Sequence, residues 1–271
     1  MDMHGKVALV LGGAKGIGKA IAFALARRGA TVILTYFDWP EESRQTQDEL
    51  KQIPGNHLAL QVDLRVPEQV KQLFATIQTR HNTLHILINN IERGGMPVVH
   101  GAYTPEQWEL EIATTLRAKW WVMHSALPLL KEAPEAAVIN FSSIAGIVGR
   151  SGPAAPIFND GYSAANRAIS SFTETWAREG APTVRVNELM LGFFETRHAE
   201  KTRGWALLSP AEQEAIRSHT LLGRTGRTEE IVAAVFFLLA EATFITGAVI
   251  RMDGGFVLGG ETVPPLPKGV E

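Results

Sequence analysis

The sequence predicts an α/β fold: a doubly wound, mostly parallel, seven-stranded sheet with helices on both faces. Apolar segments of strand length alternate with longer segments of helical period, a pattern typical of parallel strands joined by crossover helices. The strand segments are almost continuous in Val, Ile and Leu, as expected for strands that helices cover on both faces. The expected strands are Val7–Leu11, Thr31–Tyr36, Leu58–Val62, Leu84–Ile88, Ala137–Phe141, Val184–Val186 and Ala248–Ile250.

Length and composition favour one domain with a small-molecule partner. The 271 residues can bury a sizeable core, and we expect a single domain over residues 1–258, with a substrate loop at about 192–215 and a C-terminal tail over 259–271. The net charge of -2 creates no field that would gather nucleic acid or an anionic membrane. Cysteine is absent, and neither a signal peptide nor an apolar run of membrane-spanning length is present. We therefore expect a cytoplasmic protein.

A glycine-rich turn follows the first expected strand. Val7–Leu11 runs into the segment Gly12-Gly13-Ala14-Lys15-Gly16-Ile17-Gly18, and a helix is expected over Lys19–Arg28. Glycine tolerates positive φ, and a phosphate approaches backbone N–H groups at a helix N-terminus only where no Cβ blocks it. An ordinary glycine turn is the alternative, but the strand, helix and following strand together favour dinucleotide binding.

Further motifs agree with the spacing of these glycines, and together they resemble the short-chain dehydrogenase/reductase family over about residues 4–258. The resemblance implies a Rossmann-type fold, NAD(P)-dependent oxidation or reduction, and a homotetramer or dimer built partly on the helices that start near Thr104 and Gly161. The motifs that carry it are Gly12-x3-Gly16-x-Gly18, Val62-Asp63-Leu64, Asn89-Asn90, Phe141-Ser142-Ser143, Tyr162-Ser163-Ala164-Ala165, Val186-Asn187 with Gly192, Leu222-Gly223-Arg224, Glu229-Glu230-Ile231, Ile245-Thr246-Gly247 and Asp253-Gly254-Gly255.

The resemblance assigns the chemistry to Tyr162 and Ser143. Tyr162 would act as general acid or base toward the substrate oxygen, and Ser143 would orient that oxygen. A tyrosine pKa near 10 is too high for a base at neutral pH, so the family places a lysine one helical turn further on. That position is Asn166, which can hydrogen-bond a ribose hydroxyl but contributes no charge. Arg167 is adjacent, but one residue along a helix points it away from Tyr162.

Other positions also depart from the family pattern. Thr115 stands where the family usually has a water-holding asparagine; its hydroxyl could hold a water, but we expect it not to reproduce the helix kink attributed to that asparagine. Ile91-Glu92 replaces an Ala-Gly pair and brings bulk and a carboxylate beside the expected nicotinamide ribose, and Leu191 stands at the position of a proline. Ser143 and Tyr162 are further apart than in common members, which predicts an enlarged site wall.

The expected cofactor is NADP, with NAD as the alternative. NAD enzymes place an acidic residue at the end of the second strand, where this chain has Tyr36. Lys15 could pair with a 2′-phosphate, although Asp38 could reach back to a ribose. The cofactor contacts that the resemblance implies are Gly12, Lys15, Gly16, Ile17, Gly18, Tyr36, Asp63, Leu64, Asn90, Ile91, Tyr162, Asn166, Gly192, Phe193 and Thr196.

Three functions stay open. The first is an oxidoreductase similar to 3-oxoacyl reductases, acting on a small-molecule carbonyl or alcohol under an apolar lid that runs from Phe193 to Leu208. The second is a nucleotide-binding sensor or partner subunit without dehydrogenase turnover, which the altered positions would suit. The third, a lyase or dehalogenase, is least favoured, because halohydrin dehalogenases lose the glycine-rich turn and carry arginine at the position of Asn166. A metal site is not expected, since the histidines are scattered.

Overall fold

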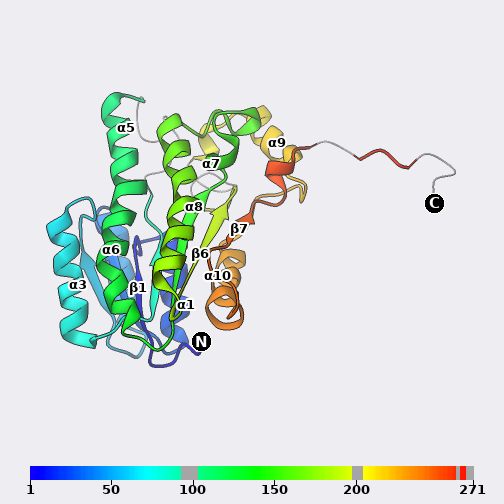
Figure 1. The fold of residues 1–271 in the computed structure, drawn as a ribbon. Helices are drawn as coiled ribbons and strands as arrows, with labels where there is room; N and C mark the ends of the chain where they lie inside the picture. Colours follow the sequence, from blue (N-terminus) through cyan, green and yellow to red (C-terminus); the bar gives the residue numbers. More distant parts are fainter. Residues whose placement is uncertain (93–102, 197–203, 261–262, 267–271) are drawn as a thin grey trace.

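Seven parallel strands form one sheet in the order β3-β2-β1-β4-β5-β6-β7, and every neighbouring pair is parallel. The computed structural model describes residues 1–92, 103–196, 204–260 and 263–266. The predicted α/β fold class is therefore confirmed (Figure 1). The strands are β1 (Val7–Val10), β2 (Thr31–Tyr36), β3 (Leu58–Gln61), β4 (Ile86–Asn89), β5 (Ala136–Ser143), β6 (Val184–Leu191) and β7 (Val249–Met252).

Helices cover the two faces of the sheet as separate layers. Successive strand residues point to opposite faces, so Val10 and Leu34 pack in one apolar cluster while Leu9 and Ile33 pack in another. The first cluster takes side chains from α1 (Gly16–Arg27), α2 (Pro40–Leu50) and α10 (Thr228–Phe236). The second takes them from α3 (Pro67–His81), α6 (Ala118–Lys131) and α8 (Asp160–Gly180). Figure 1 shows α3, α6 and α8 side by side over one face.

β6 is much longer than the predicted Val184–Val186, and this is a correction. Asn187 and Glu188 interrupt the apolar pattern, but both are buried inside the strand. The Asn187 amide donates to the carbonyl of Ile245 at 2.8 Å, and Glu188 accepts hydrogen bonds from Ser142 and Ser170. Because the Asn187 amide and Oε1 of Glu188 find partners inside the protein, the strand continues to Leu191.

β5 also extends beyond its predicted end at Phe141. Ser143 of β5 pairs with Leu191 of β6, so both strands deliver their last residues to the carboxyl edge of the sheet. The strand order reverses between β1 and β4, and ligands of doubly wound sheets bind beyond the carboxyl ends of strands at such a point.

The remaining helical segments are short or irregular. Two stretches are π-helical: Ile112–Arg117, which joins α5 to α6, and Phe237–Glu241, which continues α10. None of the helices within the described ranges is long and apolar enough to cross a membrane. The other segments are α5 (Pro105–Glu111), α7 (Ala145–Val148), α9 (Pro210–His219), and 3-10 turns at Gly152–Ala154, Trp205–Leu207 and Phe256–Leu258.

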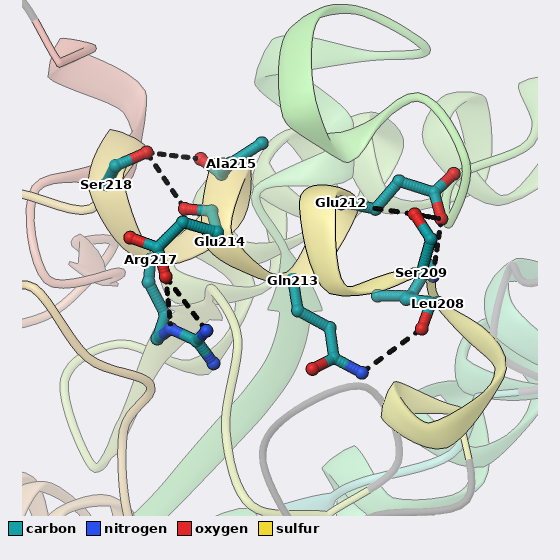
Figure 2. Close-up of polar contacts among 8 residues, drawn as sticks. All are labelled: Leu208, Ser209, Glu212, Gln213, Glu214, Ala215, Arg217 and Ser218. Atoms are coloured by element: carbon teal, nitrogen blue, oxygen red, sulfur yellow. Dashed lines mark hydrogen bonds and ion pairs between the residues drawn. The ribbon is translucent and has the colours of Figure 1, made fainter.

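α9 begins at a capping box (Figure 2). The Ser209 hydroxyl accepts from the backbone N–H of Glu212, and the Glu212 carboxylate accepts from the backbone N–H of Ser209 at 2.7 Å. Gln213 donates to the carbonyl oxygens of Leu208 and Trp205. These bonds fix the chain just before α9, at the end of the expected lid that runs from Phe193 to Leu208.

Candidate active site

The glycine-rich turn joins β1 to α1 with backbone that glycine alone adopts easily. Gly12 and Gly16 have φ of +67° and +57°. A Cβ on Gly18 would lie 2.9 Å from Nδ2 of Asn90, so the predicted close packing of helix on strand is present. A Cβ on Gly16 would meet nothing within 4 Å, which leaves the space over the turn open.

The N-terminus of α1 faces this open space. Lys15 is the N-cap residue, and its side chain makes no capping hydrogen bond. The first N–H groups of a helix have no partner within the helix and carry partial positive charge. Positive φ, open space and free helix amides are what a pyrophosphate needs, so this turn fits a dinucleotide.

A cleft of about 570 Å³ runs from the glycine turn to the end of β4. It passes Trp39 on the β2 side and reaches Glu92 and Thr114 at the other end. Of the residues predicted to contact a cofactor, Gly18, Tyr162, Asn166, Gly192 and Phe193 are not among its lining. The predicted contacts that do line it are Gly12, Lys15, Gly16, Ile17, Tyr36, Asp63, Leu64, Asn90, Ile91 and Thr196.

The glycine-turn end of the cleft carries two cations. Nζ of Lys15 lies 2.8 Å from the centroid of the Trp39 ring and 3.9 Å from a carboxylate oxygen of Glu42. Arg65 pairs with Asp63 through two hydrogen bonds, of 2.8 and 2.7 Å. This bond to Arg65 lowers the pKa of Asp63, so the carboxyl predicted to meet an adenine is already held by a neighbour.

Tyr162 sits in the first turn of α8 and contacts Glu92, which lines the far end of the cleft. Asn159 caps the helix, because its side chain accepts from the backbone N–H of Tyr162 at 2.8 Å. The Tyr162 side chain is buried, and its hydroxyl donates to Oε2 of Glu92 at 2.9 Å. The site thus joins α8 to the residue three positions beyond β4.

Burial and the neighbours Glu92 and Ser143 set the protonation of Tyr162. Burial raises its pKa well above the usual value, and the negative charge of Glu92 raises it further. The nearby Ser143 side chain opposes this and lowers the pKa, so Ser143 lies close to Tyr162. Tyr162 is therefore a phenol, not a phenolate, at neutral pH.

An apolar cluster covers the other side of Tyr162. The rings of Phe158 and Phe193 stack at 5.7 Å, and Phe158 lies 5.9 Å from the Tyr162 ring. Trp205 and Leu208 of the expected lid are buried in the same cluster, while residues 197–203 of that lid lie outside the described residues. A substrate that reaches Tyr162 beside these side chains therefore meets an apolar wall.

A buried lysine lies beside the site on α6. Lys119 is 1% exposed, and its ammonium group donates to the backbone carbonyl of Phe141 in β5. Burial lowers its pKa to about 8, and the charges of Glu92 and Glu188 oppose that shift. A cation is therefore present in the protein interior at this site, contributed by α6 and not by α8.

Comparisons with known proteins decide the family. The family model described as enoyl-(acyl carrier protein) reductase matches residues 12–257. The chain is 30% identical to 3-oxoacyl-[acyl-carrier-protein] reductase of Thermotoga maritima, over 95% of this chain and 100% of that protein. The chain belongs to the short-chain dehydrogenase/reductase family. It is also 30% identical to cyclohexanol dehydrogenase of an Acinetobacter species, over 93% of this chain and 95% of that protein.

A solved structure agrees with this family at the level of the fold. A short-chain dehydrogenase/reductase structure from Burkholderia xenovorans superimposes with a TM-score of 0.79 and 24% identity. The match covers 94% of this chain and 99% of that one. The two similar proteins from Thermotoga maritima and Acinetobacter are a reductase and a dehydrogenase, which supports an oxidoreductase activity for this chain.

Within this short-chain dehydrogenase/reductase, Thr115 is buried in the π-helical stretch Ile112–Arg117. The expectation that threonine does not reproduce the kink attributed to the family's asparagine stays a prediction. A π-helical stretch interrupts the α-helical hydrogen bonding between α5 and α6 without the family's asparagine.

Asn166 is buried one turn after Tyr162, as its spacing predicts. Its Nδ2 donates to the backbone carbonyl of Tyr162 at 2.9 Å, and its buried Oδ1 has no hydrogen-bond partner among the described residues. Its predicted contact with a ribose stays a prediction. Arg167 is exposed, so it places no cation beside the buried tyrosine.

Sequence reasoning missed Lys119 and treated Glu92 only as an obstacle. In the sequence, Lys119 is a single lysine between apolar residues of a core-facing helix. The sequence does not show whether such a lysine is buried or exposed to solvent. The contact of Glu92 with Tyr162 joins residues 70 positions apart and needed the fold.

Proposed function

We propose that this chain is an NADP-dependent oxidoreductase that interconverts a carbonyl group and an alcohol, with NAD as the alternative cofactor. The observation that carries the proposal is the meeting of Ser143 and Tyr162 at the carboxyl edge of the sheet, next to the cleft that begins at the glycine turn. Ser143 orients the substrate oxygen and Tyr162 exchanges a proton with it.

The residues of the cleft fit a nicotinamide dinucleotide. Gly12, Gly16 and Ile17 would hold the pyrophosphate at the N-terminus of α1, and Asn90 would hold the ribose near Tyr162. When bound, the nicotinamide supplies or accepts the hydride. Lys15 and Arg65 line the glycine-turn end of the cleft and support a 2′-phosphate, while Tyr36 offers no carboxylate to repel it.

The apolar cluster around Tyr162 supports an apolar substrate. Phe158, Phe193 and Trp205 wall the site with aromatic surface, which suits an acyl chain or a ring more than a sugar. The relatives that act on 3-oxoacyl groups and on cyclohexanol fall within that range. We therefore infer a 3-oxoacyl thioester or a cyclic alcohol or ketone as the substrate class.

A screen of turnover tests this function. Acetoacetyl thioesters, cyclohexanone and cyclohexanol are offered with NADP(H) and NAD(H), and nicotinamide absorbance is followed. We expect turnover of at least one of them, lost in Tyr162→Phe, because the phenol hydroxyl is the proton donor. Full activity in Tyr162→Phe would refute the role of the tyrosine.

One observation favours the second function, a nucleotide-binding protein without dehydrogenase turnover. Tyr162 gives its proton in a hydrogen bond to Glu92, and its pKa is raised, which opposes use of the phenolate as a base. Under that function the protein binds NADP(H) but turns over none of the substrates in the screen.

A further inference from the structure

The contact between Tyr162 and Glu92 poses a question about proton transfer. The phenol donates to Oε2 of Glu92 at 2.9 Å, so its hydrogen points at a carboxylate before any substrate arrives. Glu92 lines the cofactor cleft and is exposed, whereas Tyr162 is buried. The pair therefore links a buried hydroxyl directly to solvent.

A free phenolate is a poor intermediate in this site. Apolar side chains cover one side of Tyr162. Position 166 supplies no cation, because the Asn166 amide donates to the backbone carbonyl of Tyr162. The nearby cation, Lys119, donates to Phe141. Loss of the phenolic proton without replacement would leave a negative charge beside the negative charge of Glu92.

We propose that Glu92 is the terminal proton acceptor and donor of the reaction and that Tyr162 relays the proton without becoming a phenolate. This inference rests on the proposed oxidoreductase function. In alcohol oxidation, the substrate O–H bond breaks and its proton goes to Oη of Tyr162. The phenolic O–H bond breaks in the same step, and that proton goes to Oε2 of Glu92. The hydride of the substrate carbon would go to a bound nicotinamide, so the products would be the carbonyl compound, the reduced nicotinamide and protonated Glu92.

The reverse reaction uses the same groups in the opposite order. Protonated Glu92 gives its proton to Oη of Tyr162, while Tyr162 protonates the substrate oxygen. Negative charge develops on that oxygen as hydride adds to the carbonyl carbon. Because the tyrosine gains one proton for each it loses, it needs no lysine to lower its pKa. The exposed carboxylate then exchanges its proton with solvent.

The surrounding charges suit a carboxylate at this position. Lys119 of α6 is close enough for its charge to interact with Glu92, and it also interacts with Glu188 of β6. Glu111 of α5 acts on Tyr162 in the same sense as Glu92. Lys119 is thus a positioning residue that offsets negative charge around the pair, while the proton moves between Tyr162 and Glu92.

The first test needs no cofactor. The chain has three tyrosines, so ¹³Cζ-tyrosine labelling gives three NMR signals, and Tyr162→Phe identifies the one from Tyr162. In Glu92→Gln we expect the Tyr162 signal to titrate at lower pH than in the wild type, because a negative charge is removed from its hydroxyl. The matched control is Glu109→Gln, an exposed glutamate of α5, which should leave the signal unchanged. An unshifted signal in Glu92→Gln would overturn the inference.

The second test is kinetic and separates this inference from the proposed function. With cyclohexanol or a 3-hydroxyacyl thioester as substrate, we expect kcat of Glu92→Gln to fall by about 100-fold, with loss of the acid limb of the pH profile and little change in cofactor affinity. Wild-type kcat and pH profile in Glu92→Gln would overturn the relay while leaving the oxidoreductase intact. Absence of nicotinamide binding by the wild type would overturn the proposed function, and the relay with it.

Discussion

Nδ2 of Asn166 donates a hydrogen bond of 2.9 Å to the backbone carbonyl of Tyr162, one helical turn earlier in α8. The side chain at the position of the family's lysine is therefore bonded to its own helix. The helix keeps the spacing of the family site but not its cation.

A lysine at this position should restore that cation. In Asn166→Lys we expect the pKa of Tyr162 to fall by one unit or more, because a neighbouring positive charge favours the phenolate by about that amount. The pH optimum for alcohol oxidation should move downward. The uncharged variant Asn166→Met is the control for size, and equal pH profiles for the two variants would show that the charge does not reach Tyr162.

Lys15 should select the cofactor. It lies over Trp39 in the cleft lining, where a 2′-phosphate would bind under the proposed function. We expect Lys15→Ala to weaken NADPH binding by about tenfold or more and NADH binding much less, since only NADPH carries the additional phosphate. Lys19→Ala, which removes a cation that pairs with Glu49 at 2.8 Å outside the cleft, is the control. Equal losses for both cofactors in Lys15→Ala would contradict the assignment.

The buried Lys119 should make stability depend on pH. Its pKa is lowered to about 8 in the folded protein, so between pH 8 and its ordinary value the unfolded chain binds the additional proton. Stability then rises with pH in that window, by about 2 kcal/mol between pH 8 and 9.5. Urea unfolding at these two pH values should show the increase in the wild type and in the exposed-site control Lys131→Met, but not in Lys119→Met. The same pH response in all three proteins would contradict the burial of a titrating lysine.

The sequence was enough to predict that the strands exist and run parallel and where the glycine turn lies, because each depends on local pattern. The apolar run Thr31–Tyr36 forms a strand with the predicted bounds. Ser143 and Tyr162 were predicted from motifs, and the fold brings them together.

The parts that depend on pairing across the fold could not be predicted in this way. β6 extends past Asn187 and Glu188 because partners on other elements hydrogen-bond the Asn187 amide and Oε1 of Glu188. The burial of Lys119 and the contact between Glu92 and Tyr162 likewise require the packing of α6, β5 and α8. A polar residue within an apolar segment predicts an exposed side chain, and only the folded structure shows the partner that allows it to be buried.

The central claim is that the glycine turn and the cleft bind a nicotinamide dinucleotide. Calorimetric titration of the cofactor-free protein with NADPH and with NADH tests it most directly, before any substrate is known. We expect NADPH to bind with micromolar affinity and more tightly than NADH, because Lys15 and Arg65 line the cleft. Absence of binding by both would contradict the account and show that Glu92 and Asn166 have abolished the nucleotide site.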